Sequence, residues 1–238
     1  EDYIYKHVLN VAILSAIIAG QMGFPVGRIN LLVKSAILHD IGALKLQQLP
    51  DAEDLDDGTK EVVKKNTQET LDRYGDLDEE VLRLITQMQE LYTRESDAEI
   101  PAGLKESVNA NILYVADAYD RMSAMKSFEE PTSEVKAVRE LLADEERYNK
   151  KIVNALIHGI SILYPGVCVE LSNGEKGLVI TENEDNIFEP TVLDFRNNNL
   201  YDLSDPSVKQ TIEIADVMKT MDNRIKLDKS LLEEYQAN

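Results

Sequence analysis

The feature that most constrains this chain is the pair His39-Asp40, at the end of a strongly apolar helix predicted from Val26 to Asp40. The apolar positions of this helix recur with the spacing of one buried face, and they are Ile29, Leu32, Val33, Ala36 and Ile37. Asp40 falls on the same face, where a carboxylate must be paired, hydrogen-bonded or bound to a metal, because leaving it bare costs several kcal/mol. On the dipeptide alone, the simpler interpretation is a helix-ending Asp beside a solvated His.

Two other sequence features favour a metal site. The chain has only three histidines, and His7 falls on the core face of a helix predicted from Asp2 to Gln21. Asp117 lies in a run, Ile112 to Ala118, that is apolar enough to be buried. Two core-facing histidines and two core-facing aspartates on three helices can converge on one divalent ion. The alternatives are an ordinary core role for His7 and an ion pair between Asp117 and Arg121 at i+4.

The composition limits the class of protein and its partners. A chain of 238 residues with 43% hydrophobic residues can form one helical domain and a small second unit. The net charge of −19 argues against nucleic-acid polymers and anionic membranes as partners. The longest apolar run, Val11 to Gly20, is about half the length of a membrane span. The single cysteine, Cys168, indicates a reducing cytoplasm. Because residue 1 is Glu, we expect a neighbouring domain before it.

The periodicity of the sequence divides the chain in two. Further helices are predicted at 59–74, 77–92, 105–125, 131–143 and 145–163. From Tyr164 the hydrophobic period changes to two, which predicts strands at 167–171, 176–180, 190–195 and 200–203, the first pair joined by an Asn173-Gly174 turn. A final helix is predicted from Asp205 to about Met221. The predicted domains are residues 1–163, which are helical, and residues 164–238, a small β unit with a C-terminal helix.

Three motifs together resemble the HD-GYP family of the HD superfamily of metal-dependent phosphohydrolases. They are Tyr3-Ile4-Tyr5-Lys6-His7, His39-Asp40-Ile41-Gly42 and Val115-Ala116-Asp117-Ala118-Tyr119-Asp120. The resemblance implies a mainly α fold, with an HD-type helical bundle followed by a small barrel-like β unit of three to five strands. It also implies a bacterial phosphodiesterase that hydrolyses cyclic di-GMP. The metal ligands that it implies are His7, His39, Asp40 and Asp117.

The sequence also departs from the family pattern. Where the family has a His-His-Glu motif the chain has Met88-Gln89-Glu90, and the lysine after His-Asp-Ile-Gly is Ala43. The Gly-Tyr-Pro motif is reduced to Ile100-Pro101-Ala102-Gly103, and the basic cluster after Asp120 is reduced to Lys126. A two-metal site needs more ligands than these residues supply. We therefore expect one divalent ion, which could be Fe, Mn, Zn, Ni or Mg.

Two functions are compatible with this pattern. The first is a regulatory or binding module of cyclic di-GMP signalling in which phosphodiesterase activity is weak or lost. The second is an active single-metal phosphohydrolase on another phosphate ester, with Asp40 orienting or deprotonating a metal-activated water and Lys126 contacting phosphate. The second predicts that cations converge on the metal, with Lys34, Lys45, Arg94 and Lys126 as candidates. Either function is compatible with a homodimer.

Overall fold

The computed structural model describes residues 2–46, 56–74, 76–94, 99–124 and 132–218. It separates into two compact units, Glu1–Thr132 with Ala137–Ile160, and Ser133–Lys136 with Ser161–Asn238. The first unit is helical and the second contains a small antiparallel sheet, so the predicted fold class is confirmed. The predicted domain boundary after residue 163 stays a prediction.

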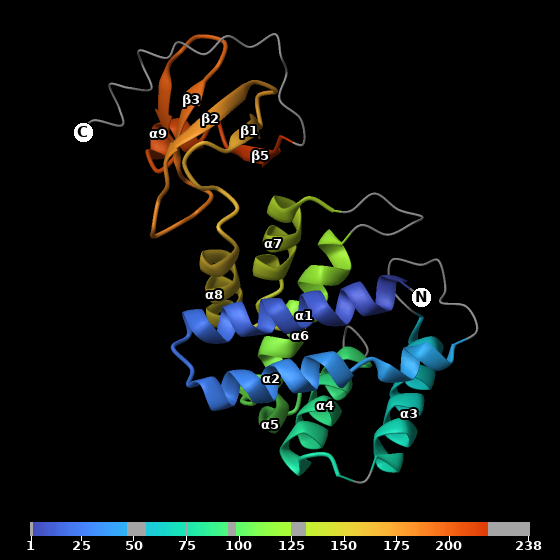
Figure 1. The fold of residues 1–238 in the computed structure, drawn as a ribbon. Helices are drawn as coiled ribbons and strands as arrows, with labels where there is room; N and C mark the ends of the chain where they lie inside the picture. Colours follow the sequence, from blue (N-terminus) through green and yellow to red (C-terminus); the bar gives the residue numbers. More distant parts are fainter. Residues whose placement is uncertain (1, 47–55, 75, 95–98, 125–131, 219–238) are drawn as a thin grey trace. The chain divides into compact units, whose positions relative to one another are not determined.

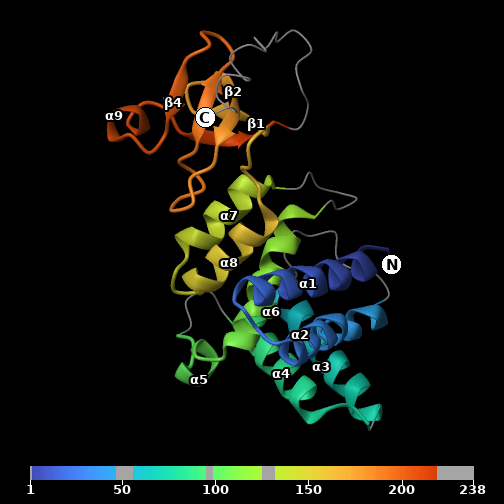
Figure 2. The same ribbon diagram turned by 60° about the vertical axis from the view of Figure 1, so that its left-hand side comes forward.

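The helical unit is organised around α6. Its helices are α1 (Asp2–Gln21), α2 (Val26–Leu38), η1 (a 3-10 helix, Ile41–Lys45), α3 (Asp57–Arg73), α4 (Glu79–Tyr92), α5 (Ala102–Lys105), α6 (Val108–Ser123) and α8 (Lys150–Ile160), with α7 at Glu134–Ala143. Helix α6 contacts α1, α4 and α8, and α1 lies alongside α2 (Figures 1 and 2). Helix α6 is buried continuously from Ala110 to Asp117, so the carboxylate of Asp117 lies in the core of this unit.

Helix α2 is shorter than predicted. It ends at Leu38, with His39 as its C-cap, and the chain continues through Asp40 into η1. Asp40 is nevertheless buried, as its place on the apolar face predicts. Ile37 was predicted on that face, but 47% of it is exposed, because it lies about 100° around the helix from the buried Ala36.

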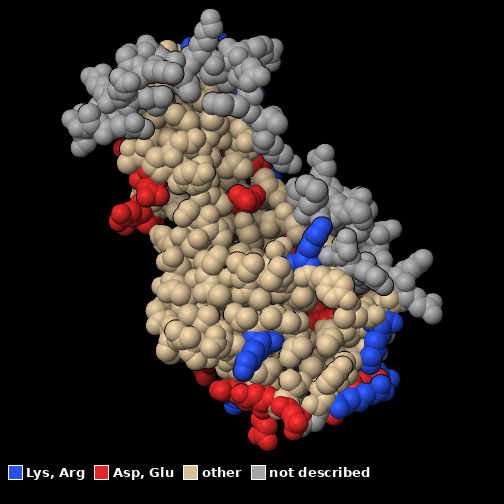
Figure 3. Space-filling model, viewed as in Figure 1, with Lys and Arg blue, Asp and Glu red and all other residues tan. Residues whose placement is uncertain are grey.

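Helix α1 is the one described helix that is long and apolar enough, over Tyr3–Gln21, to cross a membrane by length and composition. The core helix of a soluble protein passes the same test, and α1 packs against α2, α6 and α8. Its outer side carries exposed apolar residues at helical spacing, Tyr5, Leu9 and Ile13. Figure 3 shows this face of the helical unit, on which charged side chains are sparse above a lower edge that carries both acidic and basic side chains.

The second unit contains a five-stranded antiparallel sheet in the order β4-β3-β2-β1-β5. The strands are β1 (Cys168–Leu171), β2 (Lys176–Thr181), β3 (Thr191–Asp194), β4 (Leu200–Asp202) and β5 (Ile214–Val217). The predicted hairpin is confirmed, since β1 pairs with β2 and Gly174 has a φ of 82° in the turn. The described strands form an open sheet rather than a barrel, with β4 and β5 at its edges.

The predicted final helix is wrong over most of its length. Helix α9 covers only Pro206–Lys209, and the chain then forms β5, which pairs with β1. Ile212 and Ile214 are buried and Glu213 between them is exposed, the period-two pattern of a strand. Without β5, the backbone groups along one side of β1 would lack strand partners. The rest of the predicted helix, from residue 219, lies outside the described residues.

Candidate metal centre

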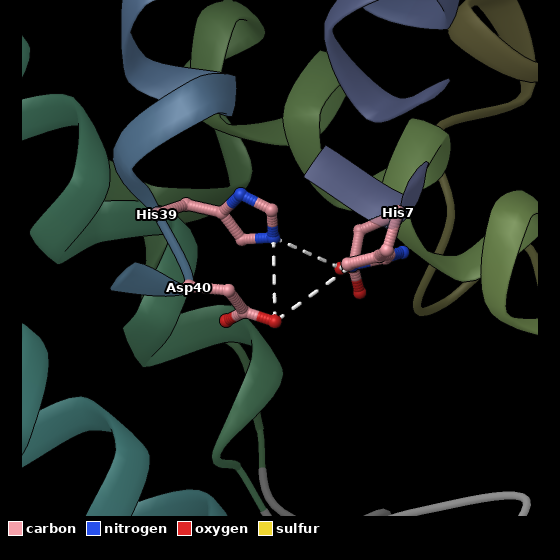
Figure 4. Close-up of side chains that lie close together, drawn as sticks. His7, His39 and Asp40 are labelled. Carbon is pink, nitrogen blue, oxygen red and sulfur yellow. Dashed lines mark hydrogen bonds and ion pairs between the residues drawn. The ribbon is translucent and has the colours of Figure 1, made fainter. Parts of the chain in front are cut away.

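The four residues predicted as metal ligands lie together inside the helical unit. His7 comes from α1, His39 and Asp40 from the end of α2, and Asp117 from α6. One ligand atom from each lies within 4.8 Å of the others, and all four residues are buried. Figure 4 shows His7, His39 and Asp40 pointing toward one another. The residues predicted from helix-face periodicity and from the family motifs therefore meet in space, and their role as ligands is taken up below as a proposal.

The shared atoms of the cluster are two imidazole nitrogens and two carboxylate oxygens. Oδ1 of Asp117 lies 3.0 Å from Nε2 of His7 and 3.3 Å from Nε2 of His39. Oδ2 of Asp40 lies 3.7 Å from both of these nitrogens. Imidazole nitrogens and carboxylate oxygens together suit divalent ions such as zinc, manganese and iron.

The outer nitrogen of each imidazole ring is held by the protein. Nδ1 of His39 donates to the carbonyl oxygen of Ala36 at 2.6 Å. Since a carbonyl can only accept, the neutral His39 ring has its free lone pair on Nε2, the atom that faces the cluster. Nδ1 of His7 contacts Oδ2 of Asp120 at 2.7 Å, and Asn10 donates to the other oxygen of Asp120 at 2.8 Å. Such outer partners are typical of histidines that bind metals, so the donor set fits a metal ion.

The backbone that follows His39 is anchored by α3 and α4. The side chain of Gln89 donates to the carbonyl oxygen of His39 at 2.9 Å. The backbone N–H of Gly42 donates to Oγ1 of Thr67 at 3.0 Å. A side chain at Gly42 would overlap backbone atoms of Val63 and Thr67, so glycine lets η1 approach α3 closely. These contacts fix the direction in which His39 and Asp40 point.

Arg121 lies against the two aspartates of the cluster. Its Nη2 donates to Oδ2 of Asp40 at 2.8 Å, and its Nε donates to Oδ2 of Asp117 at 2.9 Å. The guanidinium also lies over the Tyr92 ring, 4.6 Å from its centroid. The ion pair between Asp117 and Arg121 that was the alternative to a metal site is therefore present in the same cluster.

Burial and charge act in opposite directions on the pKa values here. Burial raises the pKa of the Asp117 carboxyl, but Arg121 and the two histidines lower it by more, so its pKa lies well below the ordinary value. Burial likewise raises the pKa of Asp40, and the neighbouring His39, Arg121 and His7 bring its pKa below the ordinary value. Burial and Arg121 lower the pKa of His7, whereas its hydrogen bonds to Asp117 and Asp120 raise it above the ordinary value. Both carboxylates are thus ionised and able to bind a cation.

The positions that depart from the family pattern have structural contacts. Met88 is buried in the core, and Gln89 holds the backbone of His39. Ala43 packs in a small apolar cluster with Ile4 and Val63. The surviving Glu90 is exposed on α4.

The cations predicted to converge on the metal have other contacts or lie elsewhere. Lys45 contacts Asn66 and Glu69, Arg94 donates to the carbonyl oxygen of Glu99, and Lys34 is exposed. Lys126, the predicted phosphate contact, lies outside the described residues. The cation found at the cluster is Arg121 instead.

Sequence reasoning missed Asp120 and Gln89 as parts of the site. Asp120 could have been found, because it lies three residues after Asp117 on the same side of one helix. Gln89 reaches His39 from a separate helix, and only the packing of α4 against α2 brings the two together.

A cavity of about 300 Å³ adjoins the cluster within the helical unit. Asp117 and Arg121 form part of its wall, and two further cations, Lys60 and Arg147, also line it. The aromatic side chains of its wall are Tyr92, Tyr114 and Tyr148. The rings of Tyr114 and Tyr148 stack with their centroids 5.2 Å apart. Glu140 and Asp144 line it as well, so the cavity combines three cations and three carboxylates with flat aromatic surface beside the candidate metal position.

Comparisons with known proteins agree with the motifs. The model of the HD domain family matches residues 4–122. The chain is 24% identical over 223 residues to cyclic di-GMP phosphodiesterase PdeB of Borreliella burgdorferi, covering 89% of this chain and 57% of that protein. It is 21% identical over 197 residues to cyclic di-GMP phosphodiesterase PA4108 of Pseudomonas aeruginosa, covering 81% of this chain and 48% of that protein. The chain thus spans about half the length of the curated relatives it matches.

Proposed function

The chain belongs to the HD domain family, and from that premise we propose that it is a regulatory or binding module of cyclic di-GMP signalling with weak or lost phosphodiesterase activity. The observation that carries the metal centre of this module is the buried cluster of two histidines and two aspartates, and the reduced activity rests on the departures from the family pattern. The two relatives, both named as cyclic di-GMP phosphodiesterases, support a cyclic dinucleotide as the ligand.

The residues that would hold one divalent ion are His7, His39, Asp40 and Asp117. When bound, such an ion polarises a phosphoryl oxygen and lowers the pKa of water. The identity of the ion is open among Fe, Mn, Zn, Ni and Mg, because imidazole and carboxylate ligands suit several of them. Asp40 is the candidate to orient or deprotonate the attacking water. One of its oxygens faces both histidines, which supports orientation, whereas its lowered pKa makes it a weak base.

Reduced activity is supported by the contacts of the residues that differ from the family pattern. The family has histidines at the positions of Met88 and Gln89. Here Met88 is buried in the core, and the side chain of Gln89 donates a hydrogen bond to the backbone carbonyl oxygen of His39. The methyl of Ala43, where the family has a lysine, contacts apolar side chains. Within the described residues, the four-residue cluster is the one group able to hold a metal. The family's histidine ligands for a second ion and its phosphate-binding lysine are thus replaced by side chains that cannot take these roles.

The test is metal content together with cyclic di-GMP binding and hydrolysis. We expect one transition metal per chain in the wild type and none in the double variant His39→Ala, Asp40→Ala. Cyclic di-GMP should bind in calorimetry, while chromatography should detect little linear product. Efficient hydrolysis would contradict the loss of activity, and a chain that takes up no metal under metal-replete reducing conditions would contradict the metal centre.

A second candidate function is an active single-metal phosphohydrolase on another phosphate ester. The cavity beside the cluster favours it, because Lys60, Arg121 and Arg147 in its wall are candidate phosphate contacts, next to the carboxylates of Asp117, Glu140 and Asp144. A screen of phosphate monoesters and diesters with the metal-loaded chain separates the two functions. If the wild type hydrolyses any of these esters and the double variant His39→Ala, Asp40→Ala does not, the hydrolase is favoured. Lys126 stays a predicted phosphate contact.

A cytoplasmic location is part of the proposal. It is supported by the single cysteine, Cys168, which is free. A homodimer and a domain before residue 1 stay predictions.

A further inference from the structure

The side chain of Arg121 is fixed at three points beside the candidate metal position. It donates to Asp40 at 2.8 Å and to Asp117 at 2.9 Å, and it lies over the ring of Tyr92. Only 11% of the side chain is exposed. A buried guanidinium with two carboxylate partners and an aromatic ring beneath it has little freedom to leave.

The contacts of Asp117 divide its two oxygens between two kinds of partner. Oδ1 faces Nε2 of His7 and Nε2 of His39, at 3.0 and 3.3 Å. Oδ2 accepts the hydrogen bond from Nε of Arg121. A carboxylate commonly bridges two metal ions by giving one oxygen to each, and here the second oxygen is held by a permanent positive charge. A second ion would have to displace this guanidinium or approach it closely against Coulomb repulsion.

We propose that the guanidinium of Arg121 takes the place of a second metal ion and restricts the cluster to one ion. This inference rests on the proposed function, since it requires that the cluster binds metal. Arg121 balances the charge of Asp40 and Asp117 as a second ion would. It also lines the neighbouring cavity, so its remaining N–H groups are available to a phosphoryl oxygen of a bound ester.

The same contacts have a purely structural explanation, in which Arg121 only neutralises buried carboxylates. The two explanations differ in what the removal of Arg121 does to metal stoichiometry. If the role is only structural, a variant without the guanidinium loses stability and still binds one ion. If Arg121 replaces an ion, the same variant gains a second site of lower affinity, because the oxygens of Asp40 and Asp117 that Arg121 occupies are freed and water can fill the remaining positions.

The experiment is a titration of the full chain with Mn²⁺, followed by equilibrium dialysis and electron paramagnetic resonance. We expect the wild type to saturate at one ion, with the signal of an isolated Mn²⁺. Arg121→Ala and Arg121→Gln should saturate at two ions and show exchange coupling between them. Arg121→Lys keeps a cation and should stay at one. The matched control is Arg83→Ala, which removes the same charge from an exposed position of α4 and should behave as the wild type.

The outcomes separate this inference from the proposed function. Two ions in the wild type, or one ion in a folded Arg121→Gln, would overturn the role of Arg121 and leave the metal centre intact. No bound ion in the wild type would instead remove the metal centre itself. Circular dichroism identifies variants that do not fold. Because both explanations expect one ion in the wild type, a folded variant without the guanidinium decides between them, and Arg121→Met, which keeps the length of the side chain, is added for that purpose.

Discussion

Oδ2 of Asp120 lies 2.7 Å from Nδ1 of His7, while Nε2 of the same ring faces Asp117. Asp120 therefore orients His7 without reaching the cluster itself, and in the proposed metal centre it would make the ring a stronger ligand. Removal of such an outer partner typically lowers metal affinity by about 10- to 100-fold. We expect Asp120→Ala to weaken metal binding within that range, measured by competition with a coloured chelator. Asp120→Asn keeps an acceptor and should have a smaller effect.

Asn10 provides the matched control for this prediction. Its side chain donates to the other oxygen of Asp120 and so acts on His7 through one more residue. Asn10→Ala should weaken metal binding less than Asp120→Ala does. Equal affinity in the wild type and Asp120→Ala would mean that His7 does not depend on this carboxylate.

Gly42 is the position at which the turn after His39 meets α3. A methyl group there would overlap backbone atoms of Val63 and Thr67, and backbone cannot move away as a flexible side chain can. We expect Gly42→Ala to lower the free energy of unfolding by about 3 kcal/mol, at the upper end of overpacking effects. Thermal denaturation measures this change, and metal affinity should fall as well because His39 and Asp40 would shift.

The control for Gly42→Ala is Gly27→Ala in the first turn of α2. A methyl at Gly27 meets no atom within 4 Å. Because alanine favours helix over glycine, this variant should be neutral or more stable by up to about 1 kcal/mol. If both variants behaved alike, the close approach of η1 to α3 would not be the cause.

The four clustered residues could be predicted because each one depends on a local pattern. The face of a helix follows from the spacing of its apolar residues, so the burial of His7, Asp40 and Asp117 could be inferred without knowing what packs against them. Their convergence came from the resemblance, which supplied the arrangement of the helices. Arg121 was recognised only as a partner of Asp117 at i+4, since the choice of Asp40 as its second partner depends on tertiary packing.

The strand β5 could not be predicted for a related reason. Asp205 and Pro206 are strong signals for a helix start, and they do begin α9. The chain leaves the helix because Ile214 pairs with Leu171, more than forty residues earlier, at the edge of β1. A short strand whose partner is distant in sequence is set by that partner rather than by its own propensity.

The lowered pKa values of Asp40 and Asp117 predict acid sensitivity of the metal-free protein. A carboxyl whose pKa is lower in the folded state than its ordinary value of 3.8 contributes stability above that value, and the contribution is lost as pH falls through the folded pKa. In the presence of a chelator, the melting temperature should therefore fall steeply below about pH 4.

Asp117→Asn should reduce this acid sensitivity, because the variant has already lost the carboxylate. The exposed Asp76→Asn serves as the control and should follow the wild type. If the melting temperatures of the wild type and of Asp117→Asn fall equally below pH 4, the ionised carboxylate of Asp117 is not a stabilising group.

Metal addition should stabilise the chain through the cluster and nowhere else. An ion that binds only the folded state adds about 2.7 kcal/mol at a concentration of 100 times its dissociation constant. We expect Mn²⁺ to raise the melting temperature of the wild type, and excess chelator to reverse the rise. His39→Ala removes a proposed ligand and should show no rise, whereas His158→Ala changes an exposed histidine of α8 and should respond as the wild type does. A chain with a net charge of −19 also attracts cations at its surface, so the comparison matters. An equal rise in all three proteins would assign the stabilisation to that surface charge and remove the support for a metal centre at His39.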